Sequence, residues 1–417
     1  MIYLVLDTMA KGKSINGLLR AIIPKVTRSG IAITGILFWI CLFLPLAVSG
    51  QGNPKSVNGL TASGFGKDPK RNVIVVTLQA GIKHGENGNP GSDLNNPLHT
   101  EKKSTIVPVH SKTQLGILEN QFTLNGKPAF LYGISYYGAL GASAAFIRKD
   151  LADMKKNGFN WIRIWANWTG FDADISAIDD HGNPRKAFLD KLKWIVMKCD
   201  RKGIIVDVTL SHGDGLNDFD AHQRAVETLV TILRPYRNWY LDLANERDIR
   251  DTRFIGFGKL KRLHEAAKKL YPQLLITASA GNDISRKDLK EYLQTVQVDF
   301  ISPHRPRDQA SPLQTKAKSH EYLSWMKDLG QTIPIHYQEP FRRGYTQWQP
   351  KAEDYITDLN GARAGGAAGW CFHNGDQREV NNGIPRRSFD MREKRLFDQL
   401  DKEELRAIKI IDKLMSR

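Results

Sequence analysis

Short apolar runs and longer amphipathic segments alternate along the chain from about residue 115 to the C-terminus. Eight short runs occur, at residues 129–135, 160–167, 203–212, 238–246, 274–281, 299–304, 333–339 and 367–375. The segments between them carry apolar residues at helical spacing. Residues 185–200 show this spacing most clearly, through Phe188, Leu192, Ile195 and Cys199. The pattern therefore predicts eight strands that are separated by helices.

Strands that are buried on both faces and joined by crossover helices form a parallel sheet. Eight such units fit a closed (β/α)8 barrel, also called a TIM barrel. Gly158, Gly203 and Gly330 follow helical segments where a left-handed cap is needed before the next strand. An open doubly wound sheet is the alternative. The glycines of residues 133–143 have the wrong spacing for the dinucleotide fingerprint that such a sheet would need to hold that ligand.

The barrel pattern is preceded by a hairpin signal. Residues 116–138, GILENQFTLNGKPAFLYGISYYG, contain two β-rich runs joined by the pair Asn125-Gly126. This dipeptide favours a tight two-residue turn. We therefore expect an antiparallel hairpin immediately before the first barrel strand, and a barrel domain that spans residues 116–417.

The N-terminal quarter has a different composition. Residues 31–50 are uncharged and apolar, follow basic residues, and end in small residues that offer a cleavage site. We expect residues 1–50 to be a signal peptide or an uncleaved membrane anchor that contacts the membrane or the export machinery. Residues 51–115 are rich in Gly, Asn, Pro, Ser and Lys, which predicts a disordered linker. In either case the barrel would lie outside the cytosol.

Charge and cysteine content narrow the function classes. The chain has 60 Lys and Arg against 44 Asp and Glu, which suits an anionic partner such as nucleic acid, anionic lipid or an acidic polysaccharide. The sequence has no zinc-finger spacing or RNA-binding motif, so we expect no nucleic-acid partner. Three cysteines, Cys41, Cys199 and Cys371, do not make a disulfide framework or a zinc-thiolate site. We expect the protein to act as a monomer.

Polar and aromatic residues gather at the ends of the eight runs, where a barrel places its catalytic groups. Two carboxylates end runs directly, Glu246 on the fourth and Glu339 on the seventh. Glycoside hydrolysis needs such a pair, one protonated and one ionised. A single glutamate after a strand is more often an ion-pairing residue. The two together predict a catalytic pair.

Residues 116–417 resemble the clan A glycoside hydrolases, and most nearly the cellulase-like family 5 group. The hairpin FTLNGKPAFLYGISYY, the pair Asn245-Glu246 after strand four and the segment IPIHYQEP carry the resemblance. It implies a hairpin that closes the barrel floor, Glu246 as proton donor, Glu339 as nucleophile, and retention of configuration. It also implies that Asn245 holds the 2-hydroxyl of the sugar, and that no cofactor or metal is needed.

The same resemblance implies several substrate-binding residues. Arg163 matches an arginine on strand two near the nucleophile, His212 and His304 match histidines on strands three and six, and Trp370 matches a tryptophan below the sugar. Trp168 and Tyr136, at strand ends, are expected to contact sugar as well. Two departures stand out: Arg247 follows the Asn-Glu pair where the family often has Pro, and residues 302–308 lack a tyrosine. Family members commonly have a tyrosine there that hydrogen-bonds the nucleophile, and Tyr337 or Tyr345 could take that role.

Two further features leave alternatives open. Arg305, Arg307, Arg342 and Arg343 flank the predicted cleft, so the β-linked glycan could be acidic, although pairing with Asp308 and other loop acids is the simpler interpretation. Histidines at 212, 304, 336 and 373 allow a metal-dependent barrel hydrolase, but the first run lacks the His-x-His of that class. A glycan-binding barrel without activity is the third alternative, although both carboxylates are retained.

Overall fold

The structure is a computed structural model that divides the chain into two units, Met1–Glu101 and Lys102–Arg417. It describes residues 111–415 except 171–172, 214 and 375–388, together with the backbone of two earlier strands. These strands, β1 (Leu60–Asp68) and β2 (Val73–Ala80), pair antiparallel with each other. They lie inside the segment predicted to be a linker, where the run NVIVVTLQ is β-rich. The expected signal or anchor, residues 1–50, lies outside the described residues.

The second unit is built around a parallel sheet of seven strands in the order β12-β11-β10-β7-β6-β14-β13. They are β6 (Leu131–Ser135), β7 (Trp161–Trp165), β10 (Ile205–Thr209), β11 (Trp239–Asp242), β12 (Ile276–Thr277), β13 (His336–Tyr337) and β14 (Gly369–Phe372). Residues 299–304 close the circle, because Pro303 bridges to Ala280 beside β12 and Ile301 bridges to Ile335 beside β13. The eight predicted strands thus form a closed ring, and the predicted (β/α)8 barrel is confirmed.

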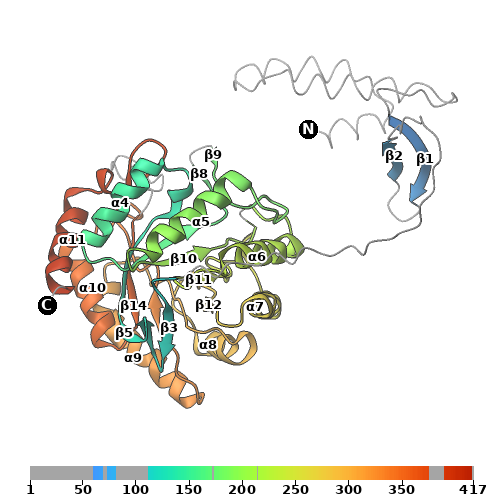
Figure 1. The fold of residues 1–417 in the computed structure, drawn as a ribbon. Helices are drawn as coiled ribbons and strands as arrows, with labels where there is room; N and C mark the ends of the chain where they lie inside the picture. Colours follow the sequence, from blue (N-terminus) through green and yellow to red (C-terminus); the bar gives the residue numbers. More distant parts are fainter. Residues whose placement is uncertain are drawn as a thin grey trace, which may run out of the picture. The chain divides into compact units, whose positions relative to one another are not determined.

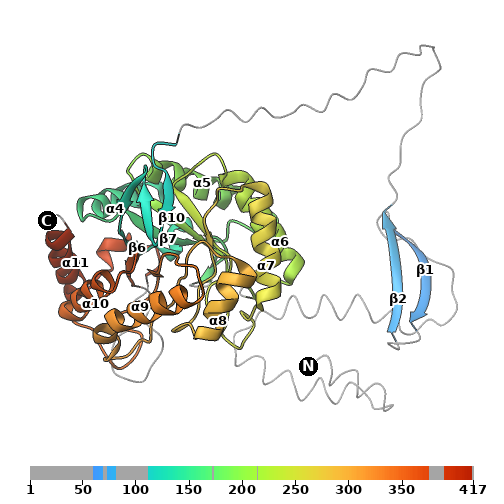
Figure 2. The ribbon, with the colours of Figure 1, turned by 90° about the horizontal axis from the view of Figure 1, so that it is seen from below.

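Helices surround this ring, as Figures 1 and 2 show from two directions. They are α4 (Ala144–Lys156), α5 (Lys186–Asp200), α6 (Phe219–Leu233), α7 (Phe257–Leu270), α8 (Arg286–Glu291), α9 (Ser311–Asp328), α10 (Ala352–Ala364) and α11 (Lys402–Met415). Gly158, Gly203 and Gly330 have φ of 75°, 71° and 77°, as their capping role requires. None of the described helices has the length and apolarity to cross a membrane.

An antiparallel sheet of three short strands precedes the barrel, β3 (Leu115–Leu118), β4 (Gln121–Leu124) and β5 (Lys127–Ala129). Asn125 and Gly126 between β4 and β5 have φ of 53° and 78°, the positive values of a type I′ turn. The fully buried ring of Phe122 lies against Phe300 and His336 inside the barrel, at centroid distances of 5.1 and 5.8 Å. The expected hairpin that closes the barrel floor is therefore confirmed.

Candidate active site

The carboxyl ends of the strands surround a cavity of about 420 Å³, a volume within the usual range of ligand pockets. Glu246 and Glu339 line it together with Asn245, and Tyr137, Trp165 and Trp168 add an aromatic surface. The polar lining also includes three arginines, Arg253, Arg307 and Arg342. The structure thus brings the two predicted carboxylates, from strands four and seven, into one aromatic cavity.

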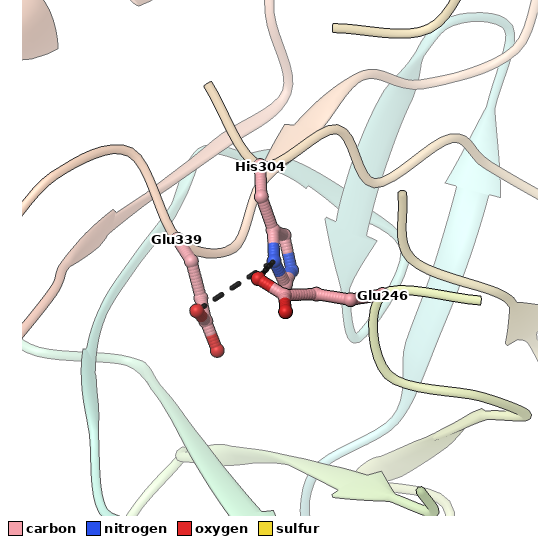
Figure 3. A group of neighbouring side chains, drawn as sticks. All are labelled: Glu246, His304 and Glu339. Carbon is pink, nitrogen blue, oxygen red and sulfur yellow. Dashed lines mark hydrogen bonds and ion pairs between the residues drawn. The ribbon is translucent and has the colours of Figure 1, made fainter. Parts of the chain in front are cut away.

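His304 stands between the two glutamates, and its ring faces both carboxylates in Figure 3. Its Nδ1 lies 3.3 Å from Oε1 of Glu246 and 3.6 Å from Oε2 of Glu339. One oxygen from each glutamate and this nitrogen all lie within 4.8 Å of one another. Both glutamates are buried, with 8% and 4% of Glu246 and Glu339 exposed. The arrangement confines two acids to one poorly solvated space.

The backbone of Glu246 adopts an uncommon conformation. Its φ is 48°, in the left-handed region that a non-glycine residue occupies at a cost of roughly 1–3 kcal/mol. Surrounding hydrogen bonds hold it there, since the Glu246 amide donates to Oγ of Ser279 and the Arg247 amide donates to the Ser279 carbonyl. Such strain concentrates at functional sites, and here it turns the Glu246 side chain into the cavity.

Cations contact both carboxylates. Nη2 of Arg307 lies 3.0 Å from Glu246 Oε1 and 2.7 Å from Glu339 Oε2, so one guanidinium bridges the pair. Arg253 adds a 2.6 Å ion pair to the other oxygen of Glu246, and Arg163 forms an ion pair with Glu339. Burial alone would raise the pKa of each glutamate, but His304 and these arginines outweigh burial and lower both pKa values well below the usual range. Both side chains are therefore carboxylates in this state.

The predicted Arg163 is confirmed as the neighbour of the nucleophile candidate. Its side chain is fully buried beneath the cavity and donates to Asp242 at 3.0 Å and to Asn245 Oδ1 at 2.9 Å. It also lies 3.2 Å from Asp207, whose pKa burial raises to about 8 despite this arginine. Arg163 therefore fixes Asn245 and Glu339 relative to each other. Sequence reasoning missed both aspartates, although a charged residue inside a buried strand run is a detectable signal.

Three predicted site residues, Tyr136, Tyr337 and Trp370, lie outside the cavity lining. Each is fully buried but points outward into the helix layer, where its polar atom bonds to Asp150 of α4, Ser319 of α9 and Asp358 of α10, respectively. The reason is the strand alternation, in which neighbouring residues face opposite sides of the sheet. The placement of these three side chains gives no support for contact with a sugar in the cavity.

His212 also lies apart from the cavity lining. Its ring stacks on His222 of α6 at a centroid distance of 5.1 Å, and the two Nδ1 atoms are 3.0 Å apart. Burial lowers the pKa of His222 to about 3, so that ring is neutral, and its Nε2 donates to the Leu243 carbonyl. His212 thus joins a structural histidine pair rather than the carboxylate site.

Tyr137, next to Tyr136, and His373, three residues after Trp370, do reach the site. Tyr137 lines the cavity, and its hydroxyl lies 2.7 Å from Nδ1 of His373, whose Nε2 lies 3.5 Å from Glu339 Oε2. Burial lowers the pKa of His373 well below its usual value, so its ring is neutral. This chain from Tyr137 through His373 contacts Glu339, where the family resemblance led us to expect Tyr337 or Tyr345.

The four arginines around the cleft divide into two groups. Arg305 pairs with Asp283, and Nε of Arg343 lies 2.6 Å from Asp401, so these two form ion pairs with acids outside the cavity. Arg307 binds the two glutamates, and Arg342 lines the cavity. Sequence reasoning missed a fifth, Arg253, although the loop after Glu246 carries several arginines.

A metal ion could geometrically be held by Glu246, His304 and Glu339, which offer three close ligand atoms. The carboxylate oxygens, however, already bond to Arg253, Arg163 and Arg307, and these cations would repel a further one. His336, one of the histidines considered for a metal site, packs instead against Trp161 in the barrel interior at a centroid distance of 4.6 Å. The arginines thus provide the charge neutralisation that a metal would otherwise supply.

Comparison with known proteins bears on the fold, and the matched solved structures are described as glycoside hydrolases. No family model and no curated protein sequence matches the chain. A glycoside hydrolase family 5 mannosidase from Rhizomucor miehei superposes with a TM-score of 0.52 at 14% identity, covering 73% of this chain and 97% of that one. An endo-1,4-β-mannanase from the same organism gives 0.51 at 13%, covering 73% and 99%.

A putative glycoside hydrolase from Bacteroides vulgatus gives a TM-score of 0.55 at 15% identity and covers 73% of this chain. This chain spans 61% of the length of that protein. The fold is therefore the one found in glycoside hydrolase family 5 structures.

Proposed function

We propose that this protein is a retaining β-glycoside hydrolase that acts on a polysaccharide or oligosaccharide. The observation that carries the proposal is the facing pair Glu246 and Glu339, whose nearest oxygens lie within 4.8 Å in an aromatic cavity. Retaining enzymes place their carboxyl groups about 5–5.5 Å apart, whereas inverting enzymes need about 6.5–9.5 Å to admit a water. The short spacing favours double displacement.

In the first step the Glu339 carboxylate attacks the anomeric carbon while Glu246, protonated, gives its proton to the departing glycosidic oxygen. A covalent glycosyl-enzyme forms and the leaving sugar departs as an alcohol. Glu246 then takes a proton from water as that water attacks the anomeric carbon and releases Glu339. Arg163 orients Glu339 for attack, and Asn245, held by Arg163, is placed to bind the 2-hydroxyl.

Arg307 has to leave the carboxylates before this sequence can begin, because it bridges the space that the scissile bond would occupy. Its withdrawal removes one positive neighbour from Glu246, and a bound sugar excludes water. Both changes raise the pKa of Glu246 toward the value that a general acid needs. Substrate binding therefore converts an ionised pair into one acid and one nucleophile.

Replacing Arg307 by Gln should move the pH profile of kcat/KM to higher pH. This profile reports the pKa values of the free enzyme, in which Arg307 lowers those of Glu246 and Glu339. Removing the cation raises both pKa values, so the acidic and the basic limb should each shift upward by about 1–3 pH units. Arg286→Gln, which removes an exposed arginine paired with Asp328, is the control and should leave the limbs in place. Unchanged limbs in Arg307→Gln would contradict this role.

Two further observations bear on the substrate and the location. Two superposed structures are described as a mannosidase and a mannanase, so β-mannan is the first candidate. The apolar segment at residues 31–50 supports an exported protein that is released or tethered outside the cytosol. We place the enzyme there as a monomer that needs no metal or cofactor.

The function is tested with a panel of soluble β-mannan, β-glucan and β-xylan, by measuring the release of reducing ends. The wild-type protein should cleave at least one polymer, and NMR of the first products should show the β-anomer before mutarotation. A double variant, Glu246→Gln with Glu339→Gln, should be inactive on the same polymer. Cleavage at the wild-type rate by the double variant would refute the proposal, and an initial α-anomer would refute retention.

A further inference from the structure

Arg342 differs from the other arginines of the cavity because it forms no ion pair with an acid in the part of the chain that the structure describes. It follows the nucleophile candidate by three positions and lines the same cavity as Glu339. Within residues 111–415 as described, no carboxylate forms an ion pair with it, and its buried Nε has no hydrogen-bond partner. Its guanidinium lies over the ring of Tyr345, 4.7 Å from the centroid. The aromatic face thus supports the charge, and no described carboxylate forms a direct ion pair with it.

A second guanidinium shares this ring. Arg307 also lies over Tyr345, 4.5 Å from the centroid, so two like charges contact one aromatic side chain. Burial lowers the pKa of Arg342 and the nearby charge of Arg307 lowers it further, while Tyr137 and the charge of Glu339 act in the opposite direction without reversing the shift. Arg307 is already paired with Glu246 and Glu339, whereas Arg342 forms no ion pair among the described residues, so a further anion would reduce the repulsion between the two guanidinium groups. The local arrangement is therefore suited to receive a negative group.

The charges of the cavity lining also favour an anionic ligand. Arg253, Arg307 and Arg342 line the cavity together with Glu246 and Glu339, which leaves three cations for two anions. The two glutamates already bond to Arg253 and Arg307, so among the described residues Arg342 is the lining arginine that forms no ion pair with an acid. Guanidinium groups bind carboxylate and sulfate through paired hydrogen bonds, and that geometry favours them over neutral hydroxyls.

We propose that Arg342, together with Arg307 and Tyr345, forms a subsite for a carboxylate or sulfate group carried by the substrate glycan. The proposal rests on the glycoside hydrolase function proposed above and specifies an acidic substrate class. It also explains how Arg307 leaves the catalytic pair. An anion bound at Arg342 offers Arg307 a new acceptor beside the same ring, so its ion pairs with the glutamates are exchanged rather than lost.

The test uses two soluble polysaccharides, β-mannan and β-glucan. Each is compared in three forms: native, oxidised at C6 to the uronate, and O-sulfated. Hydrolysis is measured as kcat/KM. Binding is measured separately by affinity electrophoresis in gels that contain each polymer, because retardation in the gel does not require catalysis. The variants are Arg342→Gln and the exposed-site control Arg286→Gln, which removes the same charge outside the cavity. Thermal unfolding of both variants confirms that they are folded.

We expect the wild-type protein to prefer one acidic form of a polysaccharide over its native form. Comparing the uronate with the sulfated form shows which anion fits the subsite. Arg342→Gln should lower this preference on the order of tenfold, while Arg286→Gln keeps it. Equal hydrolysis and retardation with acidic and native polymers would overturn the subsite and leave the hydrolase intact. If no polymer is cleaved but acidic polymers retard the wild type and not Arg342→Gln, the subsite stands and the hydrolase fails. Absence of both cleavage and retardation would overturn the subsite.

Discussion

Replacing Glu339 by Ala should lower kcat by on the order of 10⁴ to 10⁶, because the glycosyl-enzyme can no longer form. Glu339 is buried and its two oxygens are held by Arg163 and Arg307, so no neighbouring side chain can substitute for it in the same position. Glu246→Ala should also be severely impaired on polysaccharides, because the leaving oxygen receives no proton. The rates are measured on the polymer that the wild-type protein cleaves.

Rescue by azide distinguishes the nucleophile from the general acid/base residue. With an activated aryl β-glycoside as substrate, Glu339→Ala should regain turnover with azide and release the α-glycosyl azide, since azide enters the space of the missing nucleophile. Glu246→Ala should form the glycosyl-enzyme rapidly, because an activated aryl group leaves without a proton. Azide should then release the β-glycosyl azide. Rescue with the opposite anomers would reverse the assignment, and an active Glu339→Ala variant without azide would exclude this nucleophile.

Arg163→Met should destabilise the fold by about 3–5 kcal/mol, the usual effect of removing one partner of a buried ion pair. The Arg163 side chain has no solvent exposure and contacts Asp207, Asp242 and Glu339. Without it, Asp242 and Glu339 lose their shared cation in the barrel interior, and the pKa of Glu339 rises. The free energy of unfolding is measured by urea denaturation with linear extrapolation.

The matched control is Arg286→Met, which breaks an exposed pair with Asp328 and should cost no more than about 1 kcal/mol. Equal stability of the two variants would show that the buried network does not hold the barrel together. Activity provides a second measurement, because Arg163 also positions Glu339 and Asn245. We expect kcat to fall in the Arg163→Met variant even under conditions where it remains folded.

Arg247, at the position where family 5 members often have Pro, illustrates a residue whose role depends on tertiary contacts. Its guanidinium lies 3.8 Å from the Phe257 ring centroid and donates to the Tyr292 hydroxyl at 3.0 Å. It therefore packs into the helix layer while Glu246, its neighbour in sequence, turns into the cavity. The unusual φ of Glu246 separates the two directions, and no local sequence pattern predicts a left-handed glutamate.

Sequence reasoning did not predict which side chains near the strand ends face into the barrel. Trp370 lies within β14 and Tyr136 directly follows β6, and both face outward, whereas His373, just after β14, and Tyr137 contact the site. A strand buried on both faces is apolar throughout, so its sequence has no polar alternation to mark the inward side. The register of each strand in the closed ring decides which residues point into the barrel.

The sequence by itself determined the barrel, its floor hairpin and the two glutamates, because these depend on local periodicity, turn chemistry and order along the chain. Eight apolar runs, the Asn125-Gly126 turn and the positions of Glu246 and Glu339 at run ends required no knowledge of contacts. Only the tertiary structure decided that Arg307 bridges the two acids while Arg342 forms no ion pair with any described acid. Charge pairing depends on distances between segments far apart in sequence, and these distances arise only when the ring closes.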